Sequence, residues 1–246
     1  MFRYKILIEY DGTNFIGWQS QPKGRSVQKN LEKFISRILK ENIKCVAAGR
    51  TDSGVHAYEQ VAHFDSKQNI SNIFKFLKSL NHFLYHYGVV VNDLKKKNKN
   101  FHARYSAKYR IYRYILINRT ARPILDKNRA WHIINKLDLK VMKEGSKKLL
   151  GTNDFSTFRS SKCNAKSPVK TIKYIKIFSL KNKIFFEFKS ESFLQQQVRS
   201  MVGCLKYLGE KKWTLKKFEK VFKSKKRILC APPAPPCGLY LKKVIY

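Results

Sequence analysis

Hydrophobic and polar residues alternate along this chain with the periods of strands and helices. The strands predicted on this basis are Tyr4–Tyr10, Ile43–Ala48, Gln60–Phe64, Gly88–Asn92, Lys108–Asn118, Ile172–Phe178, Ile184–Phe188 and Leu239–Ile245. The predicted helices cover Val27–Leu39, residues 71–84, Leu139–Leu150, Leu194–Leu208 and Leu215–Phe222. Ser26 and Asp138 are suitable N-caps for the first and third of these helices.

Mixed strands and helices with short connections predict an α+β fold, in which helices pack on a mixed, largely antiparallel sheet. The segment Asp93–Asn100 is polar and contains four lysines, so it predicts a surface loop. We interpret it as the crossing between two halves with similar element order, residues 1–104 and 105–246.

The charge balance points to a polyanionic partner. The chain has 52 Lys and Arg residues against 16 Asp and Glu residues, a formal net charge of +36. A basic surface binds phosphate backbones by releasing their counterions, which favours RNA or DNA as the partner. The excess of Lys over Arg is also typical of an AT-rich genome, so part of the charge has this second explanation.

Several absences indicate a cytoplasmic protein. No apolar signal segment precedes the first strand, and no run approaches the ~20 apolar residues of a membrane helix. The five cysteines form no CxxC pair, which is typical of reduced thiols.

The segment Gly49–Ala57, GRTDSGVHA, is the strongest candidate for a site. It joins two predicted strands and places Asp52 and Arg50 between two glycines in a chain that is poor in acids. Arg50 has three interpretations: an ion pair with Asp52, a phosphate contact, or a side chain that fills the gap left by an extruded base. A structural turn capped by Asp52 is the alternative to a site.

GRTDSGVHA resembles the signature of the tRNA pseudouridine synthase A (TruA) family. Five further blocks resemble that family in its order: YDGTNFIGWQSQ with SVQ (residues 10–28), FHARYSAKYRIYRYIL (101–116), GTNDFSTFR (151–159), FLQQQVRSMVG (193–203) and GLYL (238–241). The chain departs from the family at Gln195–Gln197, where a His and a Met usually precede Val-Arg, and at Cys237.

The resemblance implies two related α+β halves and a homodimer that modifies uridines at positions 38–40 of tRNA. Isomerisation of uridine conserves all atoms, so no metal or organic cofactor is expected. Asp52 matches the catalytic carboxylate, and Arg50 lies in the same signature. Tyr112 matches an aromatic residue of the pocket, Arg199 a partner of the carboxylate, and Leu239 an apolar wall.

Some residues have simpler interpretations. Tyr109 and Tyr114 are predicted to be sheet-core tyrosines and Trp18 a core residue, while His56 is predicted to hydrogen-bond its loop. His82 and His86 have metal-ligand spacing but no third ligand. Two other classes of protein stay open: a non-catalytic RNA-binding protein, and a metal-dependent nuclease using Asp52 with Glu59 or Asp65.

Overall fold

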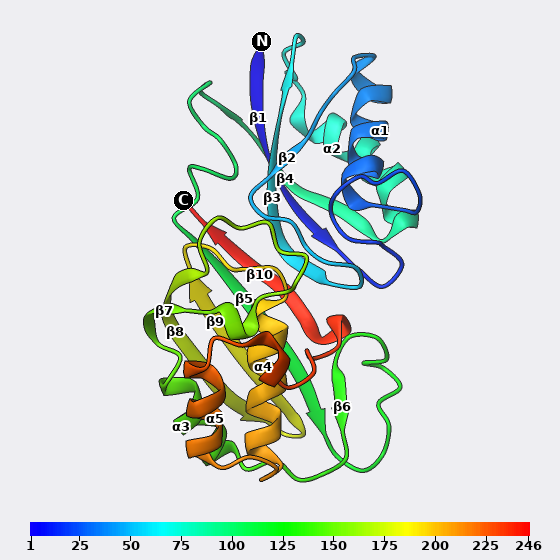
Figure 1. Cartoon of the computed structure of the whole chain (residues 1–246). Coiled ribbons are helices and arrows are strands. Elements are labelled where there is room, and N and C mark those ends of the chain that lie inside the picture. Colours follow the sequence, from blue (N-terminus) through cyan, green and yellow to red (C-terminus); the bar gives the residue numbers. More distant parts are fainter. The chain divides into compact units, whose positions relative to one another are not determined.

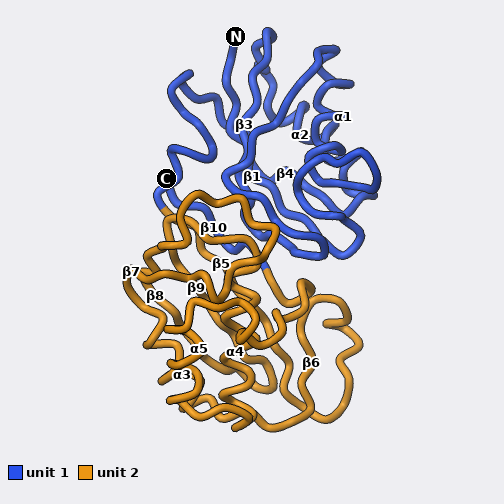
Figure 2. The backbone as a smooth tube through the Cα atoms, viewed as in Figure 1, with its two compact units in different colours: residues 1–108, 240–246 blue, residues 109–239 orange.

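A computed structural model describes residues Met1–Tyr246, and the chain divides into two compact units. Unit 1 consists of Met1–Lys108 and Tyr240–Tyr246, and unit 2 of Tyr109–Leu239 (Figure 2). The sequence placed residues 105–108 and the last strand in the C-terminal half. The structure places residues 105–108 and, apart from Leu239, the last strand in unit 1, because this strand pairs with a strand from the first half.

Unit 1 is a sheet with two helices beside it (Figure 1). Its elements are β1 (Phe2–Tyr10), α1 (Val27–Leu39), β2 (Val46–Ala47), β3 (His56–Ser66), α2 (Ile73–Leu84), β4 (Val89–Lys97) and β10 (Leu239–Ile245). β1 lies between β3 and β4 and is antiparallel to both, and β2 is antiparallel to β3. β10 is parallel to β3, with Tyr240 opposite His56.

The helices of unit 1 form where the sequence predicts them. Ser26 caps α1 by accepting a hydrogen bond from the Lys29 amide, and Asn72 caps α2 through the Lys75 amide. The buried stripe of α1 includes Phe34, whose ring stacks on Phe83 of α2 with centroids 5.3 Å apart. The two amphipathic helices therefore share one core with the sheet.

The segment after β4 is hydrogen-bonded to β3 and to the C-terminal residues of unit 1. The Ala103 amide donates to His63 Nδ1 on β3 at 3.1 Å, and Tyr246 Oη donates to the Ala103 carbonyl at 2.8 Å. The Lys108 amide donates to the Ile245 carbonyl at 2.8 Å. These contacts explain why residues 98–108 and the C-terminal strand belong to the same unit.

Unit 2 is a second sheet with helices. Its elements are β5 (Tyr109–Asn118), β6 (Trp131–Ile133), α3 (Leu139–Lys147), β7 (Gly151–Asp154), β8 (Val169–Leu180), β9 (Lys183–Ser190), α4 (Gln197–Gly209) and α5 (Leu215–Lys223). The strands β5, β9, β8 and β7 are antiparallel in that order, and β6 is parallel to β5. The predicted α+β class and the mixed, largely antiparallel sheet are confirmed.

Several predicted boundaries were wrong for a common reason. The segment Asp93–Lys97 is strand and not loop, because it pairs with Arg3–Leu7 of β1 and buries Leu94. Only Val46–Ala47 of the predicted strand Ile43–Ala48 is strand, and the short strands β6 and β7 were missed. Pairing partners distant in sequence decide these segments, and local pattern does not encode them. The cap Asp138 is confirmed.

None of the helices is long and apolar enough to cross a lipid bilayer.

His63 makes the stability of unit 1 depend on pH. Burial, followed by the nearby Arg3 charge, lowers the pKa of His63 from 6.5 to about 4. As the pH falls, the unfolded chain therefore binds this proton first, and the stabilisation is lost from pH 6.5 downwards. We expect the free energy of unfolding of the wild type to fall by about 1–2 kcal/mol more than that of His63→Asn between pH 7 and pH 5. Urea unfolding at both pH values measures this difference, and equal losses would contradict it.

Candidate active site

The loop that carries Asp52 is clamped by main-chain hydrogen bonds. The Trp18 amide donates to the Thr51 carbonyl at 3.1 Å, and the Gly54 amide donates to the Phe15 carbonyl at 3.2 Å. Phe15 O also accepts from Ser53 Oγ at 3.1 Å. Residues 11–18 therefore hold the Asp52 loop on both sides of the carboxylate. Sequence analysis missed this clamp, although its glycines lie in the first block that resembles the family.

Side chains of the sheet anchor the same loop from below. Thr51 Oγ1 shares a 2.8 Å hydrogen bond with Tyr10 Oη, and Gln60 Nε2 donates to the Gly49 carbonyl at 2.8 Å. Burial raises the pKa of Tyr10 to about 12, so its phenol stays neutral in the ordinary pH range. The base of the loop is therefore fixed by uncharged groups that do not titrate near neutral pH.

Gly17 is required for the clamp. Its φ is +116°, and a Cβ there would lie 2.6 Å from the Thr51 carbonyl oxygen. Within the motif, Gly54 has a φ of +73°, whereas a Cβ on Gly49 would meet nothing within 4 Å. The close approach of the two loops thus depends on Gly17, and the surface beside Gly49 is open.

Asp52 is half-buried in this loop, and Arg50 is exposed. No ion pair joins the side chains of Arg50 and Asp52. A half-buried carboxylate on a fixed loop is suited to act as a nucleophile or base.

His56 follows the loop at the start of β3. Its Nδ1 lies 3.0 Å from the Gly12 amide and 3.2 Å from Asp11 Oδ1. Nδ1 cannot accept from the amide and donate to the carboxylate together, and Oδ1 already accepts from the Thr13 amide and hydroxyl. We therefore assign Nδ1 as the acceptor of the Gly12 N–H. The sequence predicted that His56 would hydrogen-bond its own loop, whereas this bond joins it to Gly12 of the facing segment. Trp18 is a core residue as predicted.

The other predicted site residues lie in unit 2. Tyr112 on β5 is half-buried and meets Phe193 edge to face, with centroids 5.2 Å apart. Arg199 on α4 donates through Nε to the Ala234 carbonyl at 2.7 Å, and the Ala234 amide donates back to the Arg199 carbonyl at 2.9 Å. Leu239 is buried at the start of β10. Arg199 and the segment that leads to Leu239 are thus joined by a reciprocal pair of hydrogen bonds.

Two tyrosines beside Tyr112 differ from it. Tyr114 is buried and donates to the Pro235 carbonyl at 2.9 Å, so it is a core residue as predicted. Tyr109, which was also predicted to be core, is half-buried, and Lys189 Nζ lies 4.4 Å from its ring centroid.

The departures from the family pattern are accommodated inside unit 2. Gln197 is buried, and its Oε1 accepts from the Leu194 amide at 2.8 Å, just before α4. The Cys237 thiol lies 3.7 Å from the Ala130 carbonyl, and burial raises its pKa. Both side chains thus contact other residues of unit 2.

Metal-ligating residues are not gathered. No group of three or more His, Cys, Asp or Glu side chains is arranged to hold a metal ion. Asp65 forms a bidentate pair with Arg3, and Glu59 lies 3.8 Å from Lys243 Nζ. The carboxylates that a nuclease would need therefore face cations and are not grouped around Asp52.

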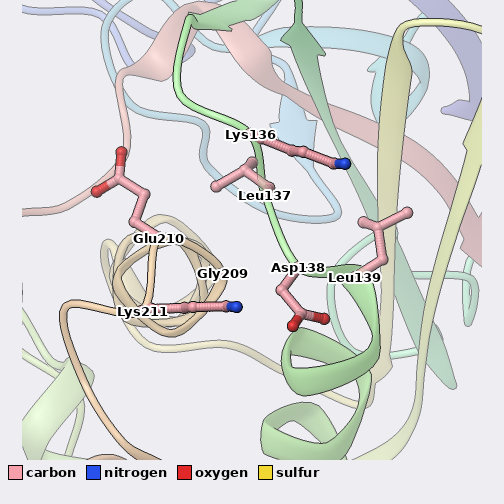
Figure 3. Close-up of a pocket in the computed structure, with 7 residues that line it drawn as sticks. All are labelled: Lys136, Leu137, Asp138, Leu139, Gly209, Glu210 and Lys211. Atoms are coloured by element: carbon pink, nitrogen blue, oxygen red, sulfur yellow. The ribbon is translucent and has the colours of Figure 1, made fainter.

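A cavity of about 540 Å³ opens in unit 2 between α3 and the end of α4 (Figure 3). Its lining includes Lys136, Asp138 and Lys211. Glu210, which also lines it, is held by Lys206 at 2.7 Å and Lys212 at 3.0 Å. None of the predicted site residues lines this cavity, so it is separate from the candidate site.

Substitution of Gly17 tests the clamp, with Gly49 as the matched control. We expect Gly17→Ala to lower the free energy of unfolding by about 1–3 kcal/mol, because alanine is strained at this φ and meets the Thr51 carbonyl. Gly49→Ala has open space and should leave stability within about 0.5 kcal/mol of the wild type. Urea denaturation measures both, and equal stabilities of the two variants would contradict the role of Gly17.

Comparisons with known proteins agree with the resemblance. The family model described as tRNA pseudouridine synthase matches residues 6–106 and 146–246. tRNA pseudouridine synthase A of Pelagibacter ubique is 63% identical over 246 residues, and that of Parvibaculum lavamentivorans is 43% identical; both alignments cover 100% of each chain. A solved Cbf5-Nop10-Gar1 complex matches 82% of this chain and 54% of its own at 13% identity and a TM-score of 0.33, from which we conclude nothing. The chain belongs to the tRNA pseudouridine synthase family.

Proposed function

We propose that this chain isomerises uridine to pseudouridine at positions 38–40, in the anticodon arm of tRNA, with Asp52 as the catalytic carboxylate. One observation carries the assignment of Asp52: its half-buried side chain sits on a loop that main-chain hydrogen bonds fix on both sides. Such a loop holds a reactive group in place before the substrate arrives. Membership of the family supplies the reaction.

The reaction exchanges one glycosidic bond for another. The bond between N1 of uracil and C1′ of ribose breaks, the base turns, and C5 bonds to C1′. The C5 hydrogen leaves as a proton and N1 gains one, so atoms and electrons balance without a redox cofactor or a metal. Asp52 acts by attack on the ribose, addition to the uracil ring, or proton removal from the sugar, and each route uses its ionised carboxylate.

Four further residues are proposed to bind the substrate. Arg50, exposed beside Asp52, contacts a phosphate or fills the gap left by the extruded base. Tyr112 offers an aromatic face to the extruded uracil, Arg199 keeps the carboxylate ionised, and Leu239 supplies an apolar wall. The hydrogen bond from Arg199 to Ala234 is suited to orient its guanidinium group.

The family resemblance also supports a cytoplasmic homodimer. The formal net charge of +36 fits a protein that grips tRNA by its shape and phosphate backbone.

Mapping of the product tests the function and the positions together. An unmodified tRNA transcript with uridines at 38–40 is incubated with the protein in excess EDTA, and pseudouridine is located by carbodiimide adducts that stop reverse transcription. We expect stops at positions 38–40, and none there in a control transcript with cytidines at these positions. Stops elsewhere would contradict the positions. Bound but unmodified tRNA would favour the RNA-binding protein. Cleavage in a parallel reaction with Mg²⁺ and no EDTA, absent when EDTA is in excess, would favour the nuclease.

A further inference from the structure

A tyrosine far from the Asp52 loop stands out of the surface of unit 1. The side chain of Tyr105 is 76% exposed, although tyrosine usually buries most of its ring. One face of its ring stacks on His102, with centroids 4.4 Å apart and an angle of 29° between the planes. Neither the proposed reaction nor the predicted pocket uses this residue.

The backbone under Tyr105 is a rigid turn. The His102 amide donates to Ser106 Oγ and the Ser106 amide donates to the His102 carbonyl, both at 2.9 Å. The amides of Arg104 and Tyr105 lie 3.2 Å from His102 Nδ1. The ring of Tyr105 is therefore held out from the surface by a turn whose polar groups are satisfied.

The rings behind Tyr105 reach the sheet. His102 packs against His63 of β3, with centroids 4.9 Å apart, and His63 Nδ1 holds the Ala103 amide. Burial, with the Arg3 charge next, lowers the pKa of both histidines, so the rings stay neutral at neutral pH. Tyr105 is thus the outermost of three ring side chains: it stacks on His102, and His102 meets His63 of β3 edge to face.

Basic residues lie near these rings. Lys5 lies opposite His63 on one side and Lys95 on the other, so the three residues form one row across β3, β1 and β4. The Arg104 guanidinium lies 5.6 Å from the Tyr105 ring centroid. An exposed aromatic ring beside a basic surface is how proteins bind unpaired bases: the ring stacks on the base while the cations attract the phosphates.

We propose that Tyr105 is a stacking platform for an unpaired nucleobase of the RNA substrate. This inference rests on the proposed function, because that function supplies the RNA. His63 lies seven residues after His56 on β3, about 23 Å along the strand at the usual rise. The base that stacks on Tyr105 is therefore a different nucleotide from the uridine isomerised at Asp52.

Binding of an unmodified tRNA transcript at several salt concentrations tests the platform. We expect Tyr105→Leu to weaken binding about tenfold at every concentration, because a stacked base is lost. The slope of log affinity against log salt should not change, since no phosphate contact is removed. Tyr105→Phe keeps the ring and should bind like the wild type. Tyr85→Leu is the matched control: Tyr85 is 71% exposed in the same unit but lies edge to face with His86, and this substitution should not alter affinity.

Four results would overturn the proposal. Unchanged affinity of Tyr105→Leu would remove the contact with RNA, and equal losses in Tyr105→Phe and Tyr105→Leu would assign the contact to the hydroxyl. A change in the molar mass of Tyr105→Leu, with affinity unchanged, would assign Tyr105 to contacts between protein chains. The binding assay needs no turnover. If the wild type binds tRNA without modifying it, the proposed function is wrong, but the variants still test the role of Tyr105. A wild type that does not bind tRNA would overturn both.

Discussion

Hydrogen bonds between main-chain atoms of residues 11–18 and of the Asp52 loop are the contacts on which the candidate site depends. They fix Thr51, which precedes Asp52, and Gly54, which follows Ser53, through backbone atoms and not through side chains. The identity of the residue matters where the two segments approach closely, because only a residue without a side chain fits at position 17. Tyr10 of β1 and Gln60 of β3 then hydrogen-bond the loop to the sheet, so that the two strands help to hold the Asp52 carboxylate in place.

Local signals predicted the elements that are decided locally. Ser26 and Asp138 begin helices as expected, and the apolar stripes of α1, α4 and α5 are buried. Pairing across long stretches of sequence was not predictable in the same way. The sequence of lysines 95–97 is typical of a loop, yet they form a strand because they pair with β1. β10 belongs to unit 1 because Tyr240 pairs opposite His56. A periodic pattern specifies the face of an element and not its neighbour.

The residues of the candidate site also differ in how far the sequence could predict them. Asp52 could be chosen as a candidate from the sequence because an acid within GRTDSGVHA is conspicuous in so basic a chain. The clamp was not, since a hydrogen bond between two loops leaves no mark except its glycines. Tyr105 was hidden for another reason: the sequence shows an aromatic residue but not its exposure. Fixed carboxylate, basic surface and exposed ring together suit an enzyme that must grip a large polyanion while it acts on one nucleotide.

The central claim is that Asp52 performs the chemistry and is not needed to hold the RNA. Its most direct measurement is tritium release from [5-³H]uridine-labelled tRNA in excess EDTA, with enzyme over substrate, because the C5 hydrogen leaves only when that carbon forms the new bond. The account predicts release by the wild type and by the surface variant Asp93→Asn. For Asp52→Asn it predicts a rate of release that is lower by a factor of about 10²–10⁴, with an unchanged affinity for tRNA. Release by Asp52→Asn at the rate of the wild type would contradict it.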